Sequence, residues 1–229
     1  MKLKILPRDK NESTREYALR ILMGNLVRVN LIPGTALSEQ EIANELNVSR
    51  TPVREAFIRL AHDDLLEILP QKGTYVAKID LEHVAESIFL RETMEHAVMQ
   101  LACQKFSDES LEKMQNCLDL QEICVQKDDY IRFFELDSVF HGMIYKTCGK
   151  KRIWKMIENM SLNYNRVRML NLKNGYYELP RLLNQHIDIL QAIEDSDWPK
   201  CEAVSNIHIN KALNDIEELK NRYPVYFKR

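Results

Sequence analysis

Hydrophobic residues recur at helical spacing along most of the chain, and polar, glycine- or proline-containing breaks divide this pattern into predicted elements. In the N-terminal third, three helices are predicted: one over 12–30, a short one that begins at about Ser38 and ends at Leu46, and one over about 49–62. Apolar runs over 65–69 and 74–76 follow them. The glycine-containing turn between the two apolar runs indicates a β-hairpin. We therefore expect a small first domain over residues 1–79.

From residue 80 onward glycine is scarce and the helical periodicity is almost unbroken. The breaks separate six predicted helices, over about 80–104, 107–126, 129–147, 150–172, 176–195 and 198–220. Short connections between successive helices favour an antiparallel bundle. We expect a mainly α protein whose second domain, 80–229, is a six-helix antiparallel bundle that ends in a frayed tail over residues 222–229.

The third predicted helix of the first domain sorts its residues by face. Its expected buried residues are Val53, Ala56, Phe57 and Leu60. Ser49 stands at the N-cap position, where its hydroxyl can accept a hydrogen bond from a free amide of the first turn. Arg50, Thr51 and Arg54 fall on another face near the N-terminal end, as in a recognition helix that contacts base edges and phosphates. An ordinary amphipathic helix with a solvated arginine face is the alternative.

The turn of the predicted hairpin carries Lys72 and Gly73. Glycine lets the backbone approach a partner closely, so the pair is suited to contact with a phosphate or the minor groove. Gly73 taken alone is more often a plain turn glycine, and the two roles are compatible.

Several segments follow one another at fixed offsets within residues 12–79. They are Pro33–Glu39, Ile42–Leu46, Val48–Ala56 and Gln71–Val76. Together they resemble the winged helix-turn-helix of GntR-family transcription regulators. The resemblance implies that the chain binds double-stranded DNA, with contacts from Gln40, Ser49, Arg50, Thr51, Arg54, Lys72 and Gly73. Asp64 stands where the family usually has glycine, and aspartate tolerates a left-handed backbone better than most residues, so we expect the turn into the wing to be retained.

The second domain contains a candidate metal site. Asp137 and His141 are four residues apart on one face of a predicted helix, and His186 and His208 lie centrally in the last two predicted helices. One carboxylate oxygen and three imidazole nitrogens converging inside a bundle would suit Zn, Ni, Mn or Fe, and would leave positions open for water or a ligand oxygen. By spacing alone, such histidines are more often hydrogen-bonded core residues than ligands.

The surrounding sequence favours the metal interpretation. Phe133–His141, Gln185–Ile193 and Ile207–His208 resemble the FCD ligand-binding domain, the helical C-terminal half of the FadR branch of GntR regulators. The resemblance implies that Asp137, His141, His186 and His208 hold a divalent metal ion. We expect zinc, with nickel, manganese or iron as alternatives.

Leu90–Glu95 resembles the opening helix of the same domain, whose arginine often faces the ligand pocket. A guanidinium can bind a carboxylate through two parallel hydrogen bonds, so Arg91 beside an open metal position predicts a small-molecule carboxylate effector. A surface pair of Arg91 with Glu95 is the alternative. Asn165 and Arg168, on the fourth predicted helix of the bundle, are further candidate effector contacts.

Composition restricts the class of protein and its cellular location. With 229 residues, 45% hydrophobic and 29% charged, the chain is typical of soluble globular proteins. Residues 1–79 carry 12 Lys and Arg against 10 Asp and Glu, and the remainder 20 against 24, the sign expected if the first domain meets phosphate. Five cysteines without a CxxC pair indicate reduced thiols. Neither a signal peptide nor a membrane-spanning run of about 18 apolar residues is present, so we expect a cytoplasmic protein that does not associate with membranes.

These features predict a ligand-responsive DNA-binding transcription regulator, a repressor, that binds a two-fold symmetric operator as a homodimer. The C-terminal domain would hold a metal-assisted carboxylate effector site. Two alternatives are a metal-dependent enzyme, in which the Asp/His₃ centre activates water, and a regulator whose metal is purely structural. We expect no enzyme activity, because no further nucleophile or general base has a motif around it and catalysis would leave the winged domain unexplained.

Overall fold

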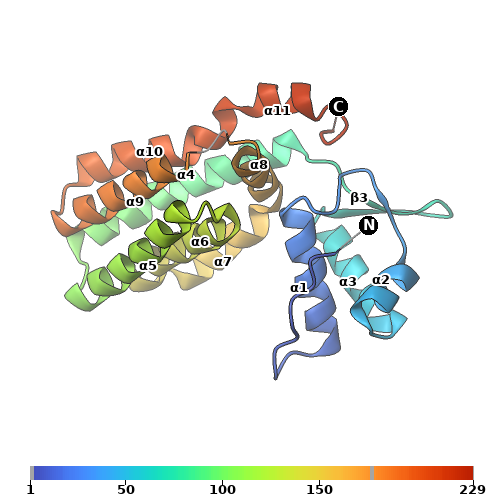
Figure 1. Ribbon diagram of the computed structural model, residues 1–229. Coiled ribbons are helices and arrows are strands. Elements are labelled where there is room, and N and C mark those ends of the chain that lie inside the picture. The colour runs from blue at the N-terminus through green and yellow to red at the C-terminus, as the bar shows by residue number, and fades with distance from the viewer. Residues whose placement is uncertain (1–2, 176–177, 229) are drawn as a thin grey trace. The chain divides into compact units, whose positions relative to one another are not determined.

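A computed structural model describes residues 3–175 and 178–228, without the side chains of residues 212–214. Along the chain the elements are α1 (Thr14–Val27), β1 (Ala36–Leu37), α2 (Glu39–Leu46), α3 (Arg50–His62), β2 (Leu66–Leu69), β3 (Gly73–Val76), α4 (Leu81–Gln104), α5 (Asp108–Gln126), α6 (Tyr130–Thr147), α7 (Lys151–Met160), α8 (Leu162–Lys173), α9 (Leu179–Glu194), α10 (Trp198–Asn214) and α11 (Ile216–Arg222) (Figure 1). The mainly helical fold with a small N-terminal sheet is confirmed.

Two compact units make up the chain. The first contains the residues up to Val84 together with Leu162–Leu170 and the chain from Glu217 onward. The second contains Ala85–Ser161 and Asn171–Ile216. Part of α8 and the C-terminal segment therefore belong to the first unit, although both lie within the predicted second domain. The predicted domain division at residue 79 remains an expectation.

The first unit is built from α1, α2, α3 and an antiparallel sheet of strand order β1-β3-β2. The predicted recognition helix buries one face, formed by Val53, Ala56, Phe57 and Leu60, as expected. Helix α3 packs against α1, α2 and β2. At the start of α2, the Ser38 hydroxyl accepts a hydrogen bond from the Glu41 amide at 3.4 Å. Asp64 takes the left-handed conformation, with φ 55, so the turn into the hairpin forms without glycine.

Two details of the first unit differ from expectation, and the hairpin register agrees with it. Ser49 occupies the N-cap position of α3, but its side chain makes no capping hydrogen bond there. Strand β1, which was not among the predicted elements, pairs with β3 through Ala36 opposite Tyr75. A strand of two residues is too short to show an alternation of apolar and polar positions in the sequence. The hairpin register places Leu66 opposite Val76, both buried, so the apolar ends of the two strands join the core of this unit.

The expected frayed tail is wrong for residues 223–228; residue 229 lies outside the described residues. The backbone N–H of Ile79 donates to the Tyr226 carbonyl at 2.8 Å, and the Lys228 N–H donates to the Ile79 carbonyl at 2.9 Å. Phe227 is buried, and Nζ of Lys228 lies 2.7 Å from a carboxylate oxygen of Asp80. The C-terminal segment is thus fixed to the chain that follows the hairpin.

In the second unit, α5 packs against α6 and α9, and α9 packs against α10. Phe133, Phe140, Ile144 and Ile189 are among the buried side chains of this bundle. Two predicted helices are each divided: 150–172 becomes α7 and α8, and 198–220 becomes α10 and α11. Neither interruption contains glycine or proline, the residues that usually mark a break between helices, so the sequence gives no sign of either division. Residues 176 and 177, expected in the fifth bundle helix, lie outside the described residues.

No helix in the described part of the chain combines the length and the apolar character needed to cross a membrane.

Candidate functional site

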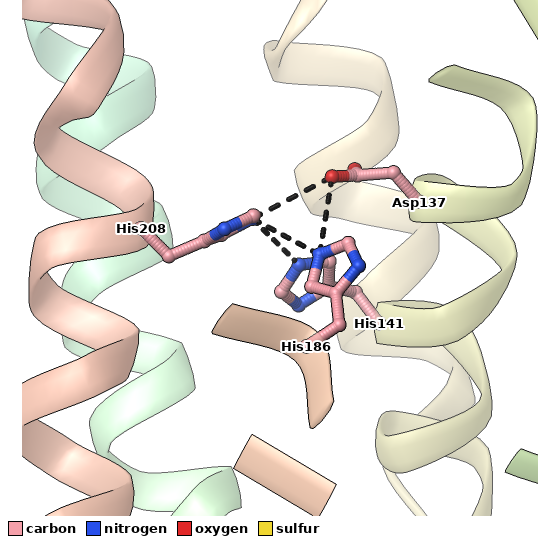
Figure 2. Close-up of side chains that lie close together, drawn as sticks. All are labelled: Asp137, His141, His186 and His208. Carbon is pink, nitrogen blue, oxygen red and sulfur yellow. Dashed lines mark hydrogen bonds and ion pairs between the residues drawn. The ribbon is translucent and has the colours of Figure 1, made fainter. Parts of the chain in front are cut away.

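The four predicted metal ligands converge inside the second unit (Figure 2). Helix α6 supplies Asp137 and His141 one turn apart, α9 supplies His186 and α10 supplies His208. All four side chains are buried, and their candidate ligand atoms lie within 4.8 Å of one another. The structure therefore brings together a set that the sequence spreads over more than seventy positions.

The separations between these atoms fit a bound cation. Nε2 of His208 lies 3.2 Å from Nε2 of His141 and 3.3 Å from Nε2 of His186. Oδ1 of Asp137 lies 3.4 Å from Nε2 of His186 and 3.5 Å from Nε2 of His208. Nitrogen and oxygen ligands at about 2.0–2.1 Å from a tetrahedral zinc ion are separated from one another by about 3.3 Å. One ion of this size fits among the four atoms.

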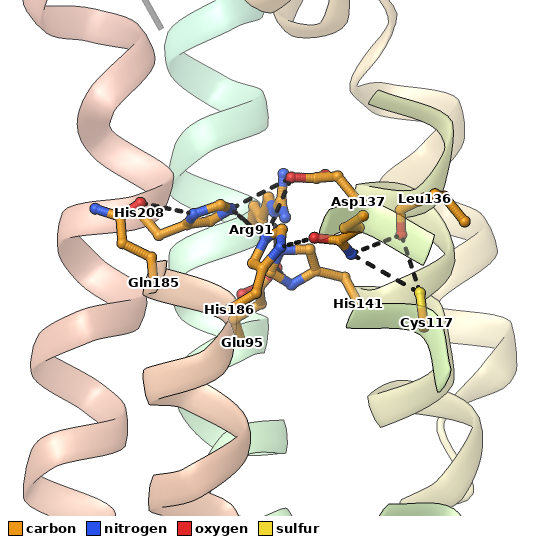
Figure 3. Close-up of polar contacts among 10 residues, drawn as sticks. Arg91, Glu95, Cys117, Leu136, Asp137, His141, Gln185, His186 and His208 are labelled. Atoms are coloured by element: carbon orange, nitrogen blue, oxygen red, sulfur yellow. Dashed lines mark hydrogen bonds and ion pairs between the residues drawn. The ribbon is translucent and has the colours of Figure 1, made fainter. Parts of the chain in front are cut away.

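The outer nitrogens of two histidines face amide oxygens (Figure 3). Nδ1 of His186 lies 2.7 Å from Oε1 of Gln121, and Nδ1 of His208 lies 3.1 Å from Oε1 of Gln185. The Gln121 amide nitrogen donates to the Leu136 carbonyl at 3.4 Å, which orients the amide oxygen toward His186. An amide oxygen only accepts, so each Nδ1 carries the proton and each Nε2 presents a lone pair to the centre.

The third histidine faces a charged partner. Nδ1 of His141 lies 3.2 Å from Oε1 of Glu95, and Nε of Arg91 donates to the same oxygen at 2.7 Å. Burial raises the pKa of Glu95, but the charges of His141 and Arg91 outweigh this effect and the net pKa is lowered. Glu95 is therefore a carboxylate despite its burial.

Arg91 fits neither sequence interpretation completely. It does pair with Glu95 four residues along α4, but the two side chains are only 4% and 1% exposed, so this is no surface pair. The guanidinium lies instead inside the bundle, in the same polar group as His141 (Figure 3). Its assignment to an effector remains a prediction.

Aromatic rings pack against two of the histidines. Phe140 stacks on His186 with ring centroids 4.5 Å apart, and Trp154 stacks on His141 at 6.2 Å. Burial lowers the pKa of His208 to about 3, against the opposing effect of its hydrogen bond with Asp137. His208 is therefore neutral at ordinary pH, as a metal ligand must be. Three imidazoles and one carboxylate form a donor set that suits Zn, Ni, Mn or Fe.

The other candidate effector contacts lie on α8. Asn165 is half-buried, and the Arg168 guanidinium lies 5.6 Å from the centre of the Tyr164 ring. Both belong to the segment Leu162–Leu170, which groups with the first unit, whereas the metal cluster belongs to the second. Their role in effector binding stays a prediction.

The predicted DNA contacts are all exposed: Gln40, Ser49, Arg50, Thr51, Arg54, Lys72 and Gly73. Nε of Arg50 donates to a carboxylate oxygen of Glu39 at 2.7 Å, which orients the guanidinium at the start of α3. The Tyr75 hydroxyl donates to the Lys72 carbonyl at 3.0 Å and fixes the hairpin tip. Gly73 has φ 112, a conformation that side chains other than glycine rarely adopt. Their role in DNA binding stays a prediction.

The sequence did not predict the residues that contact the outer ring nitrogens of the three histidines. Gln185 directly precedes His186, but nothing in the sequence connects it with His208. Gln121 comes from α5 and meets a histidine 65 positions away. Its spacing predicts Glu95 only as a surface partner of Arg91. The heptad-like position of Gln121 on the buried face of α5, among apolar residues, is the one signal that could have pointed to it.

Comparison with known proteins gives two family matches. Residues 18–76 match the family described as bacterial regulatory proteins, gntR family, and residues 86–211 match the FCD domain. The HTH-type transcriptional repressor RspR of Escherichia coli is 33% identical over 220 residues, covering 96% of each chain. The gluconate operon transcriptional repressor of Bacillus subtilis is 26% identical over 207 residues, covering 89% of this chain and 81% of that protein.

A solved structure shares the fold. The structure of E. coli McbR/YncC covers 93% of this chain and 99% of its own, with a TM-score of 0.76 and 22% sequence identity. The arrangement of an N-terminal helix-turn-helix with a small sheet and a C-terminal helical domain is therefore common to both chains.

Proposed function

The chain belongs to the GntR family of bacterial transcription regulators and carries an FCD domain, and from this premise we propose a dimeric repressor whose effector is a carboxylate bound beside a metal ion. Membership makes it a DNA-binding regulator with a ligand-binding domain and not an enzyme. The proposal adds the metal, the class of effector, the residues that contact DNA, and the dimer on a two-fold symmetric operator.

The observation that carries the proposal is the convergence of Asp137, His141, His186 and His208 with their Nε2 and carboxylate atoms turned inward. Burying a carboxylate and several lone pairs so close together is costly unless a cation compensates them. Zinc is the first candidate, and the donor set also accepts nickel, manganese or iron. Bound there, the ion would supply a Lewis-acidic position for an oxygen of the effector.

A carboxylate is the effector class that suits this site. Arg91 is buried in the same polar group as the cluster, and a guanidinium binds carboxylates through paired hydrogen bonds. The relative from B. subtilis is named for gluconate, which is itself a carboxylate. Asn165 and Arg168 remain candidates for further contacts to the effector.

DNA binding is assigned to α3 and the hairpin tip. Arg50, Thr51 and Arg54 would contact base edges and phosphates in the major groove, as N-terminal residues of recognition helices do. Lys72 and Gly73 would approach the backbone or the minor groove, with Gln40 and Ser49 as additional contacts. A homodimer would place two such units on half-sites about 34 Å apart.

Elemental analysis tests the proposal. Protein purified without chelator should contain about one equivalent of a divalent transition metal per chain, and Asp137→Ala should lose it. Asp119→Ala, an exposed aspartate of α5, is the matched control and should retain it. A wild-type protein without metal, even after reloading, would reject the proposed site.

A purely structural metal is the remaining alternative. It is distinguished by titrating zinc-loaded and chelator-treated protein with simple carboxylates in a thermal-shift assay. Under the proposal, carboxylates stabilise the zinc-loaded protein more than the metal-free protein, because the ion supplies one of their contacts. Equal shifts in both forms would favour a metal that only stabilises the fold.

A further inference from the structure

One carboxylate oxygen joins the metal cluster to Arg91. Oε1 of Glu95 lies 3.2 Å from Nδ1 of His141 and accepts a hydrogen bond from Nε of Arg91 at 2.7 Å (Figure 3). His141, Glu95 and Arg91 are all buried, so bulk water does not compete for this oxygen. Two N–H groups, one from a metal ligand and one from the candidate effector residue, share its charge.

His141 differs in this respect from the other two histidines. His186 and His208 meet the neutral amide oxygens of Gln121 and Gln185, at 2.7 Å and 3.1 Å. A carboxylate on the outer nitrogen raises the basicity of an imidazole toward a metal more than an amide does. The contribution of His141 to cation binding therefore depends on how much of the Glu95 charge is available to it.

We infer that Glu95 is a positioning residue that couples cation binding at His141 to anion binding at Arg91. The inference rests on the proposed metal and carboxylate site. A carboxylate bound to Arg91 would accept hydrogen bonds from its guanidinium and weaken the bond from Arg91 to Oε1 of Glu95. That oxygen would then interact more strongly with Nδ1–H of His141. A cation on Nε2 of His141 would in turn make its Nδ1–H a stronger donor to Glu95 and loosen the hold on Arg91.

The two effects have the same sign. Each ligand raises the affinity for the other, and by thermodynamic reciprocity the factor is the same in both directions. The regulator would therefore bind a carboxylate more tightly when the metal is present, and metal retention would rise when the carboxylate is abundant.

Zinc affinity, measured by competition with a chromophoric chelator, tests this coupling. Acetate is the probe, and chloride at equal ionic strength is the reference anion. Glu95→Gln removes the charge but keeps an oxygen that can accept from His141, as Gln121 does for His186. Arg91→Gln reports how much of the acetate effect comes from direct contact with zinc. Glu86→Gln makes the same change at an exposed position of α4 and is the matched control.

In the wild-type protein and in Glu86→Gln, acetate should strengthen zinc binding about fivefold or more, the lower end of ordinary coupling between sites. In chloride, Glu95→Gln should bind zinc about 10- to 100-fold more weakly, as for other residues that orient metal ligands. Its acetate enhancement should fall to the level of Arg91→Gln. Circular dichroism should show the same helix content in all variants.

Two results would overturn the coupling: no acetate enhancement in the wild-type protein, or an enhancement in Glu95→Gln equal to that of the wild type. Failure of the wild-type protein to bind zinc would instead reject the proposed metal site itself. The wild-type protein also permits a test without substitution. In ¹⁵N-histidine-labelled, zinc-loaded protein, acetate should move the Nδ1 resonance of His141 and leave those of His186 and His208 in place, and an unmoved His141 resonance contradicts the coupling.

Discussion

Replacing Gln121 with methionine should weaken the metal centre without touching a ligand. Gln121 is fully buried on α5, and methionine is close to it in length and volume. The substitution removes the acceptor of the 2.7 Å contact with Nδ1 of His186, and the donor to the Leu136 carbonyl at 3.4 Å. The imidazole N–H is then buried without its amide partner.

The expected magnitude follows from these two contacts. A buried donor left unsatisfied costs about 1–3 kcal/mol, and the longer bond to Leu136 adds at most about 1 kcal/mol. Loss of an outer partner of a metal-ligating histidine lowers metal affinity by about 10- to 100-fold. Urea denaturation with saturating zinc should therefore show a free energy of unfolding that is about 1–4 kcal/mol lower than for the wild type.

A matched control lies on the same helix. Gln115 is exposed, and its amide donates to the exposed Asp119 at 2.9 Å. Gln115→Met should change stability by no more than about 0.5 kcal/mol and leave zinc affinity unchanged. If Gln121→Met matched this control in both measurements, the assignment of Gln121 as the residue that orients His186 would be refuted.

Three further predictions concern the first unit. Arg54→Ala should weaken operator binding by about 1–3 kcal/mol in a fluorescence-anisotropy titration. Arg152 is exposed on α7, and Arg152→Ala should leave operator binding unchanged. Equal affinities of the two variants would contradict a base contact by Arg54. Lys72→Ala should lower the slope of log affinity against log salt by about 0.9, and an unchanged slope would exclude a phosphate contact at the hairpin tip. Phe227→Ala removes a buried ring from the C-terminal segment and should speed trypsin cleavage after the exposed Lys78. Val225→Ala, at a position that is 63% exposed, should not change the cleavage rate. Equal cleavage rates for the two variants would show that the segment does not protect this part of the chain.

The recognition helix could be predicted from the sequence because its information is local. Four apolar residues at helical spacing fixed its buried face, and the observed helix, Arg50–His62, agrees with the expected range to within a residue. The Asp137–His141 pair is likewise local. Its partners His186 and His208 were identified through the resemblance to a family, because spacing alone does not distinguish a ligand from a core histidine.

The parts that could not be predicted depend on contacts between distant positions. Lys228 and Asp80 are 148 residues apart, and no periodicity in either segment indicates that they pair. The division between α7 and α8 at Ser161 has no glycine or proline to mark it. The pairing of Arg91 with Glu95 agrees with the alternative that their spacing offers, but their burial depends on the helices that surround α4 and is not indicated by the spacing.

The position of a bound metal tests the central claim most directly. Crystals of protein loaded with zinc should be measured on both sides of the zinc absorption edge. We predict one anomalous peak per chain, about 2.0–2.2 Å from Nε2 of His141, His186 and His208 and from a carboxylate oxygen of Asp137. A peak at any other place, or hydrogen-bonded imidazoles with no peak among them, would contradict the assignment of these four residues to a metal-assisted effector site.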